Sequence, residues 1–384
     1  MLASGPASRL LRLHFAALNP RQVHQHVQVS LFRTGRIATK DRRKRFSASA
    51  AADTVELVKE LKLISGAHCI PHPDKAATGG EDAHFVSTTG GGTVGVADGV
   101  GGWADSGISP ADYSRGFMKV VESYLDGEPL DNDKKGDTSP QMKEEQRNDL
   151  RGAFEAAHAA LRIPGSCTAC VMQLDKEEKR LLALNLGDSG FMLVRKGRLI
   201  FKSPPMQHFF DCPCQFGAYP EYVDMTDRAE DAEDFAFRAK PGDIVVMGTD
   251  GLWDNCPDEE ILGLLPKGPE GVVESASLIA QRALEHSQDE RFDSPYCQSA
   301  REQGFDLTWY EKLLGTRIIN GRLECGKIIG GKWDDITVVT AFVDSVPVKI
   351  EPPPEPEIPE TVSEQNSDIV SENNSVNVSE ENSS

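Results

Sequence analysis

Acidic residues stand at the ends of short apolar segments throughout the middle of this 384-residue chain. Asp98 follows TVGV and Asp188 follows LNLG. Asp250 follows IVVMG, and the pair Asp334 and Asp335 directly precedes ITVV. A single Asp-Gly pair is usually a hairpin turn, but acids at four strand ends favour another interpretation. The strands are then expected to converge and to bring their carboxylates into one cluster.

Such a cluster predicts a metal centre, because carboxylates that repel one another in one place need cations to neutralise them. Oxygen ligands of this kind select Mg²⁺ or Mn²⁺ over zinc. Gly99, directly after Asp98, leaves room for its backbone carbonyl to turn inward as a neutral oxygen ligand. The pattern therefore indicates a two-metal hydrolytic site that acts on a phosphoryl group.

The segments between the acids predict an antiparallel sheet covered by helices. TACVMQL and LLALNLGD are joined by a charged turn at 175–179, and FMLVRK and RLIF by Gly197. Helical stretches are expected over 110–125, 146–160 and 274–285. Strands that meet through hairpins, with longer helices over them, fit an α+β class better than a doubly wound parallel sheet.

The charge of the chain divides it into three regions. The net charge is −19, but residues 1–52 hold ten basic side chains and one acid, and the segment from 346 holds nine acids and one lysine. The Arg-rich first region is typical of an organelle transit peptide, with a disordered basic arm as the alternative. The Pro/Ser/Glu-rich segment 346–384 is expected to be disordered. The predicted catalytic domain is 53–345.

Charge and hydropathy also exclude two classes of protein. The acidic balance disfavours duplex nucleic acid as a partner. No apolar run reaches the roughly 18 residues of a membrane helix. Arginine dominates the first region, so we expect import into the mitochondrial matrix rather than into a plastid.

The eight cysteines are expected to be reduced thiols with structural roles. Cys167 and Cys170 lie within the apolar run GSCTACVMQL, where side chains three positions apart on a strand face opposite ways and cannot share an ion. Cys212 and Cys214 have no second pair at ligand spacing in the sequence.

Five ordered motifs resemble the metal-dependent protein serine/threonine phosphatases of the protein phosphatase 2C type. They are GEDAHF (80–85), VADGVGGW (96–103), NLGDSG (185–190), GTDGLWDN (248–255) and WDDITVV (333–339). ADGVGGW, GSCTAC and the basic leader are similar to the mitochondrial branch of that family. The resemblance implies a four-layer αββα sandwich of two antiparallel sheets flanked by helices, with a binuclear metal site at one edge.

The resemblance also implies a ligand set for two Mn²⁺ or Mg²⁺ ions. Asp98 would bridge both ions, and Gly99 would offer its backbone oxygen to one of them. Asp250 and Asp334 would complete the ligands of the other ion. Asp98 and Asp250 would thus be the catalytic residues, and a bridging hydroxide would attack phosphorus in line without a phosphoenzyme.

Five further acids belong to this predicted site with secondary roles. Glu81 and Asp82 would hold metal-bound water, and Asp188 and Asp254 match a weaker third-metal position in the family. Asp335 stands where the family commonly has Asn, so the resemblance leaves open whether Asp334 or Asp335 is the ligand.

Two positions depart from the family pattern. Val100 replaces a His that can protonate the leaving group, and Ala77 stands near the place of a phosphate-binding Arg, with Lys75 the nearest cation. His84 and His68 are candidate substitute acids, although each is more often structural. Because a general acid typically contributes about 10²–10⁴-fold, we expect a slow phosphatase or one that favours good leaving groups.

Trp103 and Trp253 are expected to pack beside the metal motifs rather than to contact substrate. The segment 291–327 is interpreted as either a substrate flap or a plain helical insertion. The leading hypothesis is a monomeric phosphatase that acts on phosphorylated mitochondrial proteins. The alternatives are a phosphatase for small metabolites and a catalytically weak phosphoprotein-binding or adaptor protein on the same fold.

Overall fold

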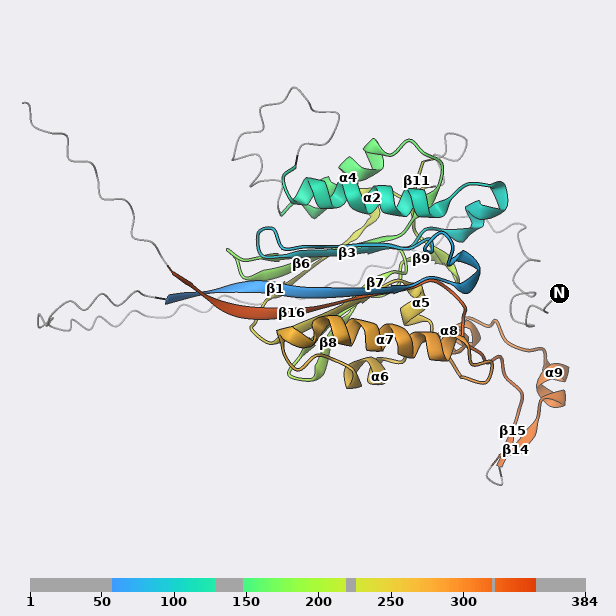
Figure 1. The fold of residues 1–384 in the computed structure, drawn as a ribbon. Helices are drawn as coiled ribbons and strands as arrows, with labels where there is room; N and C mark the ends of the chain where they lie inside the picture. Colours follow the sequence, from blue (N-terminus) through green and yellow to red (C-terminus); the bar gives the residue numbers. More distant parts are fainter. Residues whose placement is uncertain (1–56, 129–147, 219–225, 320–321, 350–384) are drawn as a thin grey trace, which may run out of the picture.

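Two five-stranded antiparallel sheets face each other in the computed structural model, which describes residues 57–128, 148–218, 226–319 and 322–349 (Figure 1). The first sheet has the order β1 (Leu57–Ile70), β16 (Ile336–Lys349), β13 (Asp243–Gly248), β7 (Gly190–Arg195) and β8 (Arg198–Lys202). The second has the order β12 (Glu233–Arg238), β6 (Arg180–Leu186), β5 (Ala169–Asp175), β3 (Thr93–Ala97) and β2 (Ala83–Ser87).

Helices cover the outer face of each sheet, so the molecule has four layers (Figure 1). The second sheet carries α2 (Pro110–Leu125) and α4 (Leu150–Ala160), and the first carries α6 (Asp258–Gly263) and α7 (Val272–Ser287). The predicted α+β sandwich is thereby confirmed. No helix in the described part of the chain is long and apolar enough to cross a membrane.

Three apolar layers fill the spaces between these four layers. Val96, Met172 and Met247 belong to the core between the sheets. Phe117 belongs to the core beneath α2 and α4, and Ile279 to the core beneath α7. Cys167 packs in the α2–α4 core and Cys170 in the core between the sheets. These two thiols therefore face opposite ways, as the sequence predicts.

The longest ladder pairs β1 with β16 along their full length, from Leu57 opposite Lys349 to Ile70 opposite Ile336. β1 was absent from the strands expected from the sequence. Its buried Leu61 and Leu63 alternate with charged residues, as suits the edge strand of a sheet. β16 runs to Lys349, past residue 345, where the sequence analysis places the end of the predicted domain.

The strand ends that carry the acids lie at one end of the sandwich. Thr249 connects two of them: its amide donates to the Thr337 carbonyl (3.2 Å), and its hydroxyl accepts from the Thr337 amide (3.1 Å). A second link joins the other sheet, where the Thr168 hydroxyl accepts from the Asp98 amide (3.0 Å) and contacts the Ser189 hydroxyl (2.7 Å). Gly187, with φ +109°, allows the chain to pass from β6 to β7 beside Thr168.

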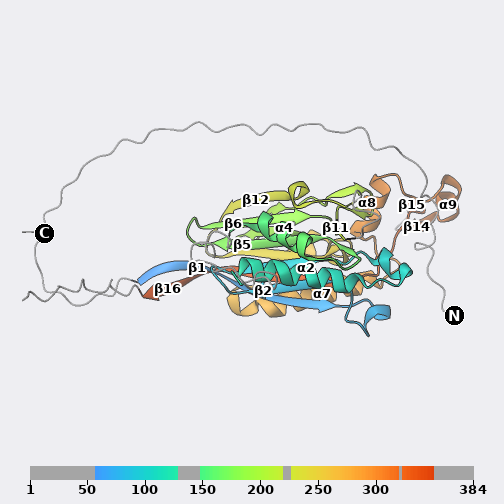
Figure 2. The same cartoon turned by 90° about the horizontal axis from the view of Figure 1, so that it is seen from above.

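The segment 291–327 contains α8 (Pro295–Glu302), α9 (Trp309–Leu314) and a hairpin of β14 (Arg317–Ile319) and β15 (Arg322–Glu324). α9 and the hairpin project beyond one end of the sandwich in both views (Figures 1 and 2). The segment is therefore not purely helical. The predicted transit peptide 1–52 and most of the predicted acidic tail lie outside the described residues.

Candidate metal centre

Asp250 is the centre of a group of four other carboxylates. It stands at the start of α5 (Asp250–Trp253), directly after β13. Burial, and then the charge of Asp250, raises the pKa of Asp98 well above its usual range. The same two causes raise the pKa of Asp188 to about 6 and that of Asp334 to about 7. The predicted convergence of strand ends is thus present in the structure.

Asp254 is the fourth of these carboxylates, and Asp82 lies near Asp98 at the edge of the group. Burial raises the pKa of Asp254 to about 7, with Lys332 opposing and Asp250 reinforcing the shift. Burial, and then the charge of Asp335, raises the pKa of Asp82 well above its usual range. The Thr249 hydroxyl donates to Oδ2 of Asp82 at 2.8 Å.

The unpaired oxygens of this group fit a hard divalent cation. Oδ1 of Asp82, of Asp188 and of Asp250 are buried and accept no hydrogen bond within the described residues. A buried carboxylate oxygen without a partner is costly, and a cation would satisfy several of them at once. The converging donors are all carboxylate oxygens, which suit Mg²⁺ or Mn²⁺.

Gly99 is held where no larger residue fits. A Cβ at this position would meet the Glu81 carbonyl oxygen at 2.7 Å and the Pro110 carbonyl oxygen at 2.9 Å. The Gly99 amide donates to the Glu81 carbonyl at 3.2 Å. This close approach, rather than an unusual φ, explains why glycine follows Asp98.

Glu81 and Asp335 are engaged by other partners. The Glu81 carboxylate pairs with Lys75. Asp335, which is 1% exposed, accepts from the amides of His72 (2.7 Å) and Glu81 (2.9 Å) and contacts Lys75 at 3.3 Å. Asp334 instead faces Lys332 at 3.7 Å. This geometry favours Asp334 over Asp335 as the ligand.

Lys332 is the main feature that the sequence analysis missed. Its Nζ lies 2.6 Å from Asp250 Oδ2, 2.8 Å from Asp254 Oδ2 and 3.4 Å from Asp211 Oδ1. Burial lowers the pKa of Lys332, but Asp250 and Asp254 outweigh it, so the pKa stands well above its usual range. The sequence could have indicated this lysine, because it stands two residues before Asp334 in GGKWDD and must therefore lie near the carboxylates.

The structure shows what surrounds the positions at which the chain departs from the family pattern. Val100 precedes the short helix Gly101–Ser106, and its amide donates to the Ser166 carbonyl at 3.0 Å. His84 and His68 make no hydrogen bond or ion pair with the acids among the described residues. The guanidinium of Arg115 donates to the carbonyls of 78–80 and so holds the loop that precedes Glu81.

Both tryptophans beside the motifs make structural hydrogen bonds. Trp103 Nε1 donates to the Ser166 hydroxyl at 2.6 Å, and Trp253 Nε1 donates to the Gly248 carbonyl at 2.8 Å. A pocket of about 290 Å³ opens beside the acids. Its lining includes Asp188, Lys202, Asp250, Trp253, Asp254 and Tyr296.

Comparison with known proteins places this site in a family. The chain is 39% identical over 305 residues to probable protein phosphatase 2C 1 of Oryza sativa subsp. japonica, covering 79% of this chain and 81% of that protein. The chain belongs to the protein phosphatase 2C-type family. Members of this family are metal-dependent protein serine/threonine phosphatases, and so is this chain. No protein-family model matches it.

Two further relatives support the same family. Protein phosphatase PTC7 homolog of Homo sapiens is 34% identical over 282 residues, covering 70% of this chain and 81% of that protein. The X-ray structure of the photosystem II phosphatase PBCP matches with a TM-score of 0.63 at 37% identity. That match covers 73% of this chain and 99% of the solved phosphatase.

The different partners of Asp334 and Asp335 lead to a prediction for their asparagine variants. Asp334→Asn removes one repelling charge, so the metal-free protein keeps or gains stability, but Mn²⁺ no longer raises its melting temperature as it does for wild type. Asp335→Asn replaces one of the two acceptor oxygens with an NH2 donor, so one of the two amides that it binds loses its acceptor, which costs about 1–3 kcal/mol of unfolding free energy, while the Mn²⁺ shift remains. Thermal melts in EDTA and in Mn²⁺ measure both effects. The reverse pattern would move the ligand to Asp335.

Proposed function

We propose that this phosphatase hydrolyses phosphoserine and phosphothreonine in mitochondrial matrix proteins, as a monomer with two Mn²⁺ or Mg²⁺ ions. The observation that carries the proposal is the group of carboxylates around Asp250, with three unpaired buried oxygens, beside an open pocket. Maintaining several repelling carboxylates in one place serves a cation site, and a scaffold would not require them.

Each acid has a proposed role in that site. Asp98 follows β3 in the second sheet and would bind both ions, and the backbone oxygen of Gly99 would bind one of them. Asp250 and Asp334 would hold the other ion. The ions, when bound, lower the pKa of a water molecule and neutralise charge on the phosphoryl oxygens.

The outer acids and the lysines shape the surroundings of the phosphoryl group. Glu81 and Asp82 would accept hydrogen bonds from water at the centre. Asp188 and Asp254 line the pocket and could take a weaker third ion. Lys332 contacts both Asp254 and Asp250, so its ammonium supplies a positive charge beside a proposed main ligand as well as beside the proposed third site.

The first test is turnover by the full-length chain. We expect hydrolysis of p-nitrophenyl phosphate and of a phosphothreonine peptide in Mn²⁺ or Mg²⁺, none in EDTA, and a loss of at least about 10²-fold in Asp250→Asn. Turnover of small phosphate esters alone would support the metabolite phosphatase. No turnover, with Mn²⁺ still raising the melting temperature, would support the phosphoprotein-binding protein.

A second variant tests the missing leaving-group acid. Val100→His introduces a proton donor two residues after Asp98, so phosphopeptide turnover should rise by at least about tenfold, toward the roughly 10²–10⁴-fold that a general acid contributes. p-Nitrophenolate leaves without protonation, so its turnover should change little. Val100→Ala is the matched control and should leave the ratio of the two rates unchanged. An equal rise for both substrates would contradict this role.

The proposed location rests on the Arg-rich leader of residues 1–52. A specific observation favours the plastid instead: one solved relative is named as a photosystem II phosphatase. The leader fused to a fluorescent protein should enter mitochondria, and replacing Arg9 and Arg12 by Glu should abolish import, because transit peptides depend on their basic face. Import into plastids would overturn the mitochondrial proposal and leave the phosphatase activity untouched.

A further inference from the structure

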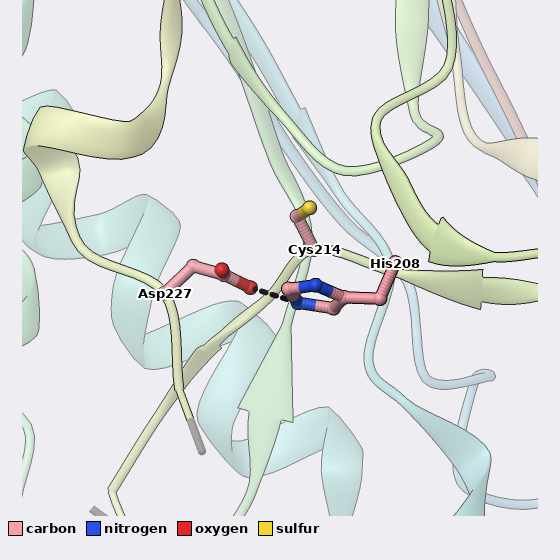
Figure 3. A group of neighbouring side chains, drawn as sticks. All are labelled: His208, Cys214 and Asp227. Carbon is pink, nitrogen blue, oxygen red and sulfur yellow. Dashed lines mark hydrogen bonds and ion pairs between the residues drawn. The ribbon is translucent and has the colours of Figure 1, made fainter. Parts of the chain in front are cut away.

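A second cluster of potential metal ligands lies apart from the carboxylates around Asp250. His208, Cys214 and Asp227 come from two segments of the chain, and their side chains lie close together (Figure 3). One ligand atom from each of the three lies within 4.8 Å of the others. His208 Nε2 is 2.9 Å from Oδ2 of Asp227.

The backbone around the cluster holds two of these side chains in place. Asp227 and Gln215 are joined twice: the Gln215 amide donates to Asp227 Oδ2 at 2.8 Å, and the Asp227 amide donates to the Gln215 carbonyl at 3.0 Å. The Cys214 amide donates to the Met206 carbonyl at 3.0 Å. Ligands that are fixed before an ion arrives lose less entropy when it binds.

The third ligand, His208, belongs to a short hairpin. β9 (Gln207–Phe209) pairs with β10 (Cys212–Pro213). The His208 side chain is 49% exposed, whereas that of Asp227 is 13% exposed. The cluster is thus open to solvent on the histidine side, which leaves room for water as a fourth ligand.

We propose that His208, Cys214 and Asp227 bind Zn²⁺ at a site separate from the catalytic centre. Sulfur, imidazole and carboxylate together are a zinc-type ligand set, and three protein ligands leave one position for water. One thiolate and one carboxylate also neutralise the two charges of the ion. Burial and the neighbouring Asp227 raise the pKa of Cys214 to about 12, so zinc binding displaces the thiol proton.

The sequence analysis assigned Cys212 and Cys214 structural roles because no second pair stands at ligand spacing. The fold supplies the missing ligands from His208 and Asp227 instead. Cys212 is not part of the cluster, although it lies two residues from Cys214 on the same hairpin.

The hairpin connects this site to the catalytic acids. Gln207, next to His208, donates from Nε2 to Asp188 Oδ2 at 3.0 Å. Asp211, at the turn with φ +60°, contacts Lys332 at 3.4 Å and accepts from the Tyr296 hydroxyl at 3.3 Å. Zinc would therefore fix the hairpin that places Gln207 and Asp211 against the catalytic pocket.

Cobalt spectroscopy of the full-length chain tests the site without measuring activity. Co²⁺ added to the chelator-treated protein should give a thiolate-to-cobalt charge-transfer band, and Zn²⁺ should remove it. The proposed ligands of the carboxylate centre include no sulfur, so Co²⁺ bound by them gives no such band. Cys214→Ser should abolish it, whereas Cys212→Ser, the matched control, should retain it. His208→Ala should weaken Co²⁺ binding by at least about tenfold, since even outer partners of a metal site contribute that much.

Three results would overturn the proposal: no band in wild type, a band that survives in Cys214→Ser, or a band lost in Cys212→Ser. Circular dichroism of the metal-free variants checks that each one folds. If Cys214→Ser does not fold, His208→Ala and Asp227→Asn test the site instead, because the proposal requires each of them to weaken the band. An unchanged band in both variants would exclude the site.

Discussion

Mutual repulsion among buried carboxylates is the constraint on which this structure depends. Burial, and then the charge of Asp250, raises the pKa of Asp98, Asp188 and Asp334. Lys332 offsets part of this repulsion from within the group. Three buried carboxylate oxygens still have no partner in the described residues. A chain that keeps such a group folded needs both a rigid framework and a cation.

The three apolar cores supply that framework. The acids proposed as ligands stand at or next to the end of a strand whose inward side chains belong to a core, as for Val96 before Asp98 and Met247 before Asp250. Close packing resists small displacements of those strands. Hydrogen bonds between Thr249 and Thr337 then join neighbouring strand ends at the site itself. The acids cannot relax apart without disturbing the sandwich.

The sequence predicted much of the site because strand ends and acids are local features. Asp98, Asp250 and Asp334 follow or precede apolar runs. The strand-like pattern of those runs, together with the turn residues, is enough to place the three acids at strand ends. The partners of Asp335 could not be predicted, because they depend on a contact between segments more than 250 residues apart. β1 was missed for the same reason: its alternating pattern becomes a strand only through the long ladder with β16.

The ladder between β1 and β16 also separates its outer end from the acidic end of the sandwich. Each strand has 14 residues, which at about 3.3 Å per residue is roughly 45 Å. Ile70 and Ile336 lie at the acidic end, and Leu57 and Lys349 lie at the opposite end. The points where the described chain enters and leaves this ladder therefore lie far from the carboxylates. A change at either of those points can leave every acid of the group in place, so the two ends of the ladder and the carboxylate group can vary independently.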